Sequence, residues 1–198
     1  MTEIGMAVAL AAILNFIPLW RMAQGGSVSL EMLPILIIAL RWGAGSGMMA
    51  GVVYGLVQLA LGPFIIHPAQ LVLDYPLPYM LVGLAGIFSN KINLKAKGST
   101  YGWLLLAVFT GGLGRFISHF LSGIIFFAQY APEGQSPWVY SAIYNISYLL
   151  PSLLLSYIIM IPLIKNIVII LIERVKSLES ITTIAEYPMF VRIRFQKT

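Results

Sequence analysis

Long apolar stretches recur along almost the whole chain and are separated by short segments rich in glycine, proline or polar residues. A helix needs about 20 mostly apolar residues to cross a bilayer. Of the 198 residues, 59% are hydrophobic and only 10% are charged, which is far more apolar than a soluble domain. The sequence therefore predicts an all-α integral membrane protein surrounded by lipid, with no nucleic-acid partner.

Six spans are predicted, at about residues 3–20, 30–42, 45–61, 69–89, 101–129 and 138–172. The second is short enough to tilt or re-enter, whereas the last two exceed the bilayer thickness and are expected to tilt, bend or project into water. No short apolar stretch with a small-residue cleavage site precedes the first span, so we expect that helix to be retained. The spans form one predicted transmembrane domain, residues 1–176, followed by a polar or amphipathic C-terminal tail, residues 177–198.

The basic residues predict the orientation, because cytoplasmic loops carry an excess of lysine and arginine. With the N-terminus inside, six spans leave Arg21 as the only basic residue in an outer loop. The basic residues then on the cytoplasmic side are Arg41, Lys91, Lys95, Lys97, Lys165, Arg174 and Lys176. A five-span arrangement would move the last cluster across the membrane and is less favoured. Both termini are therefore predicted to be cytoplasmic.

Several kinds of chemistry are excluded or disfavoured. The absence of cysteine excludes disulfides, thiolate catalysis and cysteine-ligated metals, and no glycine-rich loop ending in Gly-Lys-Ser/Thr is present to bind ATP. An aspartyl protease needs two aspartates, and Asp74 is alone. A serine hydrolase is a weaker alternative, because Ser122 could reach His119 one helical turn away. We predict no catalytic residue, metal site or cofactor.

Asp74 is the most informative polar residue, because a carboxylate near hydrocarbon costs several kcal/mol and usually marks a functional site. The six-span topology brings it together, in the outer half of the membrane, with an imidazole, an amide, a glycine and several aromatic rings. The predicted substrate-binding residues are Asp74, Tyr75, His119, Gly123, Phe127, Trp138, Tyr140 and Asn145. A carboxylate among aromatic faces suits a small planar cation with hydrogen-bonding edges.

These residues also have structural explanations. Asp74 could simply pair with Arg115, for which Glu31 is an alternative partner. The outer tyrosines and the tryptophan could belong to the interfacial aromatic belt, and His119 alone could be a packing residue. Their convergence on one side of the membrane favours a ligand site.

Small residues repeat along two of the spans. Glycines 47, 51 and 55 share one face of the third span, which predicts close helix packing inside the protein. The first span has two adjacent small-residue faces, made by Gly5, Ala7, Ala9 and Ala11. For this span, docking of a partner protein competes with internal packing.

Several short motifs resemble those of the thiamine-specific substrate-binding (S) subunits of energy-coupling factor (ECF) transporters. They lie at residues 3–11, 25–34, 73–76, 114–123 and 140–145, and the resemblance extends over about residues 3–175. It implies an S-component bundle in a prokaryotic plasma membrane. Such a subunit binds thiamine from outside, docks on an ECF transmembrane subunit with two ATPase subunits, and delivers the vitamin inward.

The resemblance also implies roles for individual residues. Asp74 would face the positively charged thiazolium with Tyr75 beside it, and the first loop would act as a lid. Matching ligand-contacting positions are His119, Gly123, Tyr140 and Asn145, and the docking face would be formed by Gly5, Ala7, Ala9 and Ala11. Two positions depart from the pattern: the acidic residue is commonly glutamate, and Phe127 lies where a stacking tryptophan is expected. A subunit for another small vitamin is the nearest alternative.

Overall fold

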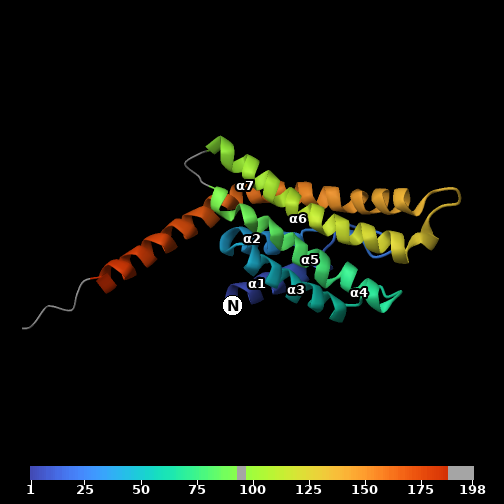
Figure 1. Cartoon of the computed structure of the whole chain (residues 1–198), viewed down its shortest axis with the longest axis horizontal. Coiled ribbons are helices and arrows are strands. Elements are labelled where there is room, and N and C mark those ends of the chain that lie inside the picture. The colour runs from blue at the N-terminus through green and yellow to red at the C-terminus, as the bar shows by residue number, and fades with distance from the viewer. Residues whose placement is uncertain (93–96, 187–198) are drawn as a thin grey trace, which may run out of the picture.

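The structure is a computed structural model that describes the backbone of residues 1–92 and 97–186, and the side chains of residues 1–92 and 99–164. These residues form an elongated bundle of helices (Figure 1). The described residues also include one short two-stranded antiparallel sheet. The first half contains α1 (Thr2–Phe16), β1 (Trp20–Arg21), β2 (Ser27–Val28), α2 (Met32–Trp42) and α3 (Ala44–Ala60). The second half contains α4 (Pro68–Asp74), α5 (Pro76–Val82), the 3-10 helices η1 (Gly83–Lys91) and η2 (Ala128–Tyr130), α6 (Lys97–Phe126) and α7 (Pro137–Glu186).

Three helical segments in the described part of the chain are long and apolar enough to cross a membrane: Pro68–Lys91, Ser99–Phe126 and Pro137–Ile164. The other three apolar helices, α1, α2 and α3, are shorter. The predicted succession of six apolar helical segments is therefore confirmed, with unequal lengths.

The fourth segment is broken, although its sequence predicts one continuous helix. α4 ends at Asp74, Tyr75 has φ −120° and ψ −80°, and α5 begins at Pro76. A proline lacks the N–H of a regular helix and disfavours helical backbone at the residue before it. Pro76 therefore accounts for the break, which places Asp74 at a helix end inside the protein.

α2 lies at the centre of the bundle. Its buried residues share one hydrophobic core with side chains of α1, α3, α5, α6 and α7. At 1.5 Å per residue the helix is about 16 Å long. Because it is surrounded by protein, this short helix does not need to match the thickness of a bilayer.

The glycines of α3 permit close packing inside the chain. A Cβ atom on Gly51 would overlap the Tyr79 carbonyl of α5, and one on Gly55 would lie 2.5 Å from Cα of Pro76. The prediction of internal helix packing for this face is confirmed.

The two small-residue faces of α1 differ in the structure. Ala7 and Ala11 are buried where α1 packs on α2 and α3. Gly5 and Ala9 point outward and are exposed. No heavy atom of the described residues lies within 4 Å of a Cβ built on Gly5, apart from its own helix and neighbours. Of the predicted docking residues, Gly5 and Ala9 are thus the accessible ones.

α6 and α7 pack against each other along one side of the bundle, and the C-terminal part of α7, red in Figure 1, projects away from it. The helix continues through residue 176 to Glu186, so the first part of the predicted tail extends α7. Residues 187–198 lie outside the described residues.

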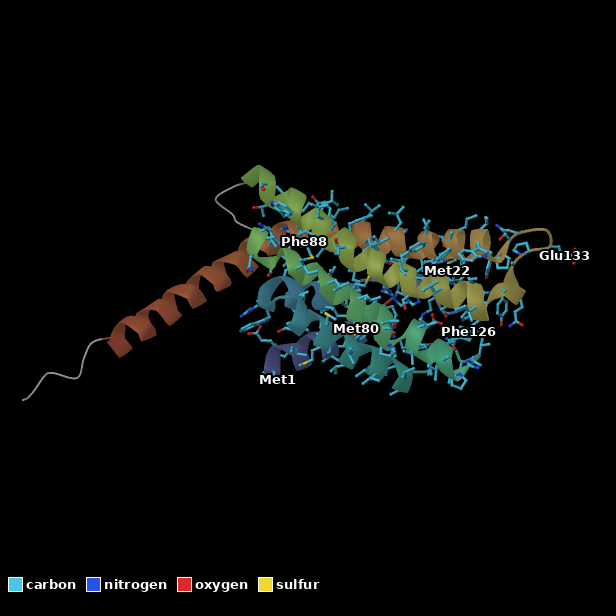
Figure 2. All side chains as sticks on the ribbon, viewed as in Figure 1. Met1, Met22, Met80, Phe88, Phe126 and Glu133 are labelled. Atoms are coloured by element: carbon cyan, nitrogen blue, oxygen red, sulfur yellow. The ribbon has the colours of Figure 1, made fainter. Side chains whose placement is uncertain are left out.

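The two ends of the bundle are built differently. Figure 2 shows Met22, Phe126 and Glu133 toward one end and Met1 and Phe88 toward the other. The first end, here called the loop end, carries the connections α1–α2, α3–α4 and α6–α7. These connections surround the candidate site.

Candidate ligand-binding site

A cavity of about 240 Å³ lies at the loop end, between the first loop and helices α3 to α7. Seven of the predicted substrate-binding residues line it: Asp74, Tyr75, His119, Gly123, Phe127, Tyr140 and Asn145. The chain thus brings together residues from three of the predicted spans, as the six-span topology predicted.

Trp138 is the predicted site residue that does not line the cavity. Its side chain is 59% exposed, and its ring contacts the edge of Phe120 at 5.9 Å between centroids. This position on the outer surface of α7 fits a residue of the interfacial aromatic belt.

Asp74 presents its carboxylate to the cavity from the end of α4. Oδ2 accepts a hydrogen bond from Nε2 of Gln70 at 2.7 Å, and Oδ1 lies 3.2 Å from Nδ1 of His119. No lysine or arginine forms a salt bridge with Asp74 within the described side chains. The carboxylate is therefore oriented by two neighbours without a paired cationic side chain.

Arg115 pairs with Glu31 and not with Asp74. The structural explanation of Asp74 as the ion-pair partner of Arg115 is therefore wrong. Nη2 of Arg115 lies 2.8 Å from Oε1 of Glu31, and both side chains are almost fully buried. The same nitrogen donates to the hydroxyl of Tyr79, whose ring lies under the guanidinium at 4.4 Å. Tyr54 and Gln58 donate to the other oxygen of Glu31. This network neutralises Arg115 at the cavity wall.

Gly123 lies where α6 packs closely against α7. A Cβ atom at this position would overlap Oγ of Ser141, so the glycine allows the two helices to approach closely. One turn along α7, Nδ2 of Asn145 donates to the Ser141 carbonyl at 2.8 Å, and its Oδ1 accepts from the Tyr148 hydroxyl at 2.8 Å. The amide of Asn145 is therefore held in one orientation at the cavity wall.

Aromatic rings form two further parts of the wall. Tyr140, Tyr144 and Tyr148 follow one another at four-residue intervals on α7, with ring centroids 5.8 and 5.9 Å apart. Phe127 stacks on Phe64 of the α3–α4 loop at 6.1 Å. Lining residues that were not predicted from the sequence include Gln70, Phe64, Tyr144 and Tyr148. The four-residue spacings of Gln70 to Asp74 and of the three tyrosines were the available signals.

The first loop covers the cavity. β1 and β2 form a hairpin whose Gln24 amide donates to the Tyr144 hydroxyl at 3.0 Å, while the Ser29 amide donates to Oγ of Ser152 at 3.2 Å. A Cβ atom on Gly26 would lie 2.6 Å from the ring of Tyr148. Only glycine fits this close approach between the loop and α7.

A family model described as "Thiamine transporter protein" matches residues 1–172. The chain belongs to the thiamine transporter family. Thiamine transporter ThiT of Bacillus subtilis strain 168 is 40% identical over 165 residues, which cover 80% of this chain and 86% of the relative. ThiT of Lacticaseibacillus paracasei is 30% identical over 151 residues, covering 72% and 75%. The solved structure of ThiT from Listeria monocytogenes superposes with a TM-score of 0.77 at 30% identity, covering 83% of this chain and 92% of that one.

Membership of the thiamine transporter family confirms the resemblance and the all-α membrane fold expected from the sequence. It also identifies the chain as a prokaryotic membrane protein and a transporter component that is not an enzyme. The hydrolase alternative has no support in the site geometry, since Oγ of Ser122 is buried and makes no hydrogen bond with the described residues.

Proposed function

We propose that the chain is the thiamine-binding S subunit of an ECF-type ATP-binding cassette importer in a prokaryotic plasma membrane. The observation that carries this proposal is the carboxylate of Asp74 at the wall of the cavity, oriented by His119 and Gln70 and paired with no cationic side chain among the described residues. Thiamine carries a permanent positive charge on its thiazolium ring, which would supply the missing partner.

The walls of the cavity support the same ligand. A cation near an aromatic ring gains roughly 0.5–2 kcal/mol, and the rings of Tyr140, Tyr144 and Phe127 all border the cavity. The held amide of Asn145 and the tyrosine hydroxyls offer hydrogen bonds to the edge of a flat heterocycle. A cavity of about 240 Å³ suits a small ligand, since pockets for drug-sized molecules hold about 300–1,000 Å³.

The charge of the ligand can be tested directly by isothermal titration calorimetry. Purified, ligand-stripped protein is titrated with thiamine and with thiochrome, the uncharged tricyclic oxidation product of thiamine, with riboflavin and biotin as further candidates. The proposal predicts saturable binding of one thiamine per chain and much weaker binding of thiochrome. Equal affinity for the charged and the uncharged compound would contradict it, and tighter binding of riboflavin or biotin would favour an S subunit for another vitamin.

Transport would depend on partners. We propose that the N- and C-termini are cytoplasmic and that the chain docks on an ECF transmembrane subunit carrying two ATPase subunits. The exposed Gly5 and Ala9 on α1 offer a flat face for such a contact, because small residues let helices in a membrane approach closely. Proteoliposomes that contain the whole complex should accumulate thiamine only with ATP, and ATP-independent accumulation by this chain alone would refute this mechanism.

A further inference from the structure

We propose that Arg115 is a positioning residue that fixes the tautomer of His119, so that the ring donates a hydrogen bond to Asp74 and stays neutral. This inference rests on the proposed function for the identity of the ligand. The contacts from which it is argued all join residues of this chain. Arg115, which borders the same cavity, would then act on the ligand through His119 and Asp74.

The hydrogen-bond donors decide the tautomer. Nε of Arg115 lies 3.3 Å from Nε2 of His119. A guanidinium has only N–H donors and no acceptor, so Nε2 of the imidazole must be the acceptor and carry no proton. In a neutral ring the proton then lies on Nδ1, which faces Oδ1 of Asp74 at 3.2 Å.

A protonated His119 would not fit this arrangement. Its Nε2–H would point at the Arg115 N–H, which places two donors and two positive charges against each other. Other titratable or charged groups lie around the imidazole on neighbouring elements. They are Asp74 on α4, Glu31 before α2, and Tyr148 on α7, whose ring centroid lies 6.3 Å from that of His119. The carboxylate of Asp74 thus accepts a hydrogen bond from a neutral His119, and no positive charge on that ring offsets its negative charge.

Arg115 is rigid enough for this task. The ion pair with Glu31, the hydrogen bond to the Tyr79 hydroxyl and the contact with the Tyr79 ring hold the guanidinium from three sides. Its side chain is only 5% exposed. Arg115 and His119 are four residues apart and share a face of α6, so Nε is directed at the imidazole.

His67 provides an internal reference, because the chain has two histidines and the other has the opposite environment. Nδ1 of His67 accepts a hydrogen bond from the Ala69 amide at 3.1 Å at the start of α4. A neutral His67 therefore carries its proton on Nε2. The structure thus predicts opposite tautomers for the two rings of one protein.

The test is ¹⁵N NMR of the full chain with ¹⁵N-labelled histidine, in detergent and without ligand, with His67→Gln to assign the signals. Two double variants remove both buried charges together. Glu31→Gln/Arg115→Gln keeps a nitrogen donor bonded to Cδ, as Nε is in arginine. Glu31→Leu/Arg115→Leu removes the donor. We expect the Nδ1–H form of His119 in the native chain and in the glutamine pair, and loss of that form in the leucine pair.

Either of two results overturns the proposal: an Nε2–H form of His119 in the native chain, or an unchanged Nδ1–H form in the leucine pair. If the leucine pair does not fold, the tautomer of the native chain decides, because the guanidinium of Arg115 offers His119 only N–H donors and therefore requires the Nδ1–H form.

Thiamine titrations of the same three proteins provide a separate readout. We expect the leucine pair to bind at least about tenfold more weakly and to become pH-dependent between about pH 5 and 8, where a free imidazole titrates. The glutamine pair should stay close to the native chain. If the tautomers are as expected but no protein binds thiamine, the proposed function fails and the positioning role stands. If thiamine binds and the tautomer of the leucine pair is unchanged, only the positioning role fails.

Discussion

Nδ1 of His119 lies 3.2 Å from Oδ1 of Asp74, and this contact joins α6 to the point where the fourth segment of the chain is broken. Because α4 ends at Asp74, the carboxylate projects from a helix end toward the cavity. Gln70 holds the other oxygen from one turn earlier. The carboxylate of Asp74 is therefore held at the cavity by two fixed neighbours, Gln70 and His119.

Replacing Gln70 should weaken thiamine binding without abolishing the fold. Its Nε2 donates both to Asp74 and to the Phe64 carbonyl, and its Oε1 accepts from the Ile66 amide. Loss of one such hydrogen bond to a charged group costs about 1.5–3 kcal/mol, so we expect Gln70→Leu to raise the Kd of thiamine roughly 10- to 100-fold. Calorimetry measures this change. The exposed Gln129→Leu is the matched control, and equal effects of both variants would argue against a role in the site.

Gly123→Ala should disturb the crossing of α6 and α7. The new methyl group would overlap Oγ of Ser141, and overpacking of this kind typically costs about 1–3 kcal/mol. We expect a lower Tm in detergent and weaker thiamine binding, both partly restored by adding Ser141→Gly. If Gly123→Ala weakens binding with the Tm unchanged, and Ser141→Gly restores nothing, then the glycine serves the ligand directly.

Substitutions on the exposed face of α1 should separate docking from binding. Gly5→Leu and Ala9→Leu place bulk where the described chain leaves space, so thiamine affinity should stay within about twofold while copurification with the proposed ECF partner subunits is lost. Leu10→Phe, on a different face of the same helix, serves as the control and should copurify normally. Normal copurification of both test variants would remove α1 from the docking surface.

Intrinsic tryptophan fluorescence should respond only weakly to thiamine. The chain has four tryptophans, and none of them, including Trp138, lines the cavity. We expect a small fractional change in a fluorescence titration, with the same fractional change in Trp138→Phe, under conditions in which calorimetry reports full binding. Strong quenching that Trp138→Phe removes would show that the start of α7 moves onto the ligand.

The sequence predicted the helical segments and seven of the residues that line the cavity, because apolar length and four-residue spacing depend on local chemistry alone. It did not predict the break at Tyr75, since Pro76 was compatible with a bend inside a single helix. The choice of Arg115 between Asp74 and Glu31 also depended on how α2 packs into the bundle, which no spacing within one helix reveals. Trp138 was predicted for the site but lies outside the cavity lining, with its ring packed against Phe120.

Removing the charge of Asp74 tests most directly the proposal that this carboxylate recognises a cation. Native protein, Asp74→Asn and Asp74→Glu are titrated with thiamine by calorimetry after removal of bound ligand. We predict that Asp74→Asn, which keeps the shape but loses the charge, raises the Kd roughly 10- to 100-fold, as expected for a lost charged contact of about 1.5–3 kcal/mol. Asp74→Glu should stay within about tenfold of the native chain. An Asp74→Asn protein that binds thiamine as tightly as the native one would contradict the proposal that this carboxylate recognises a cation.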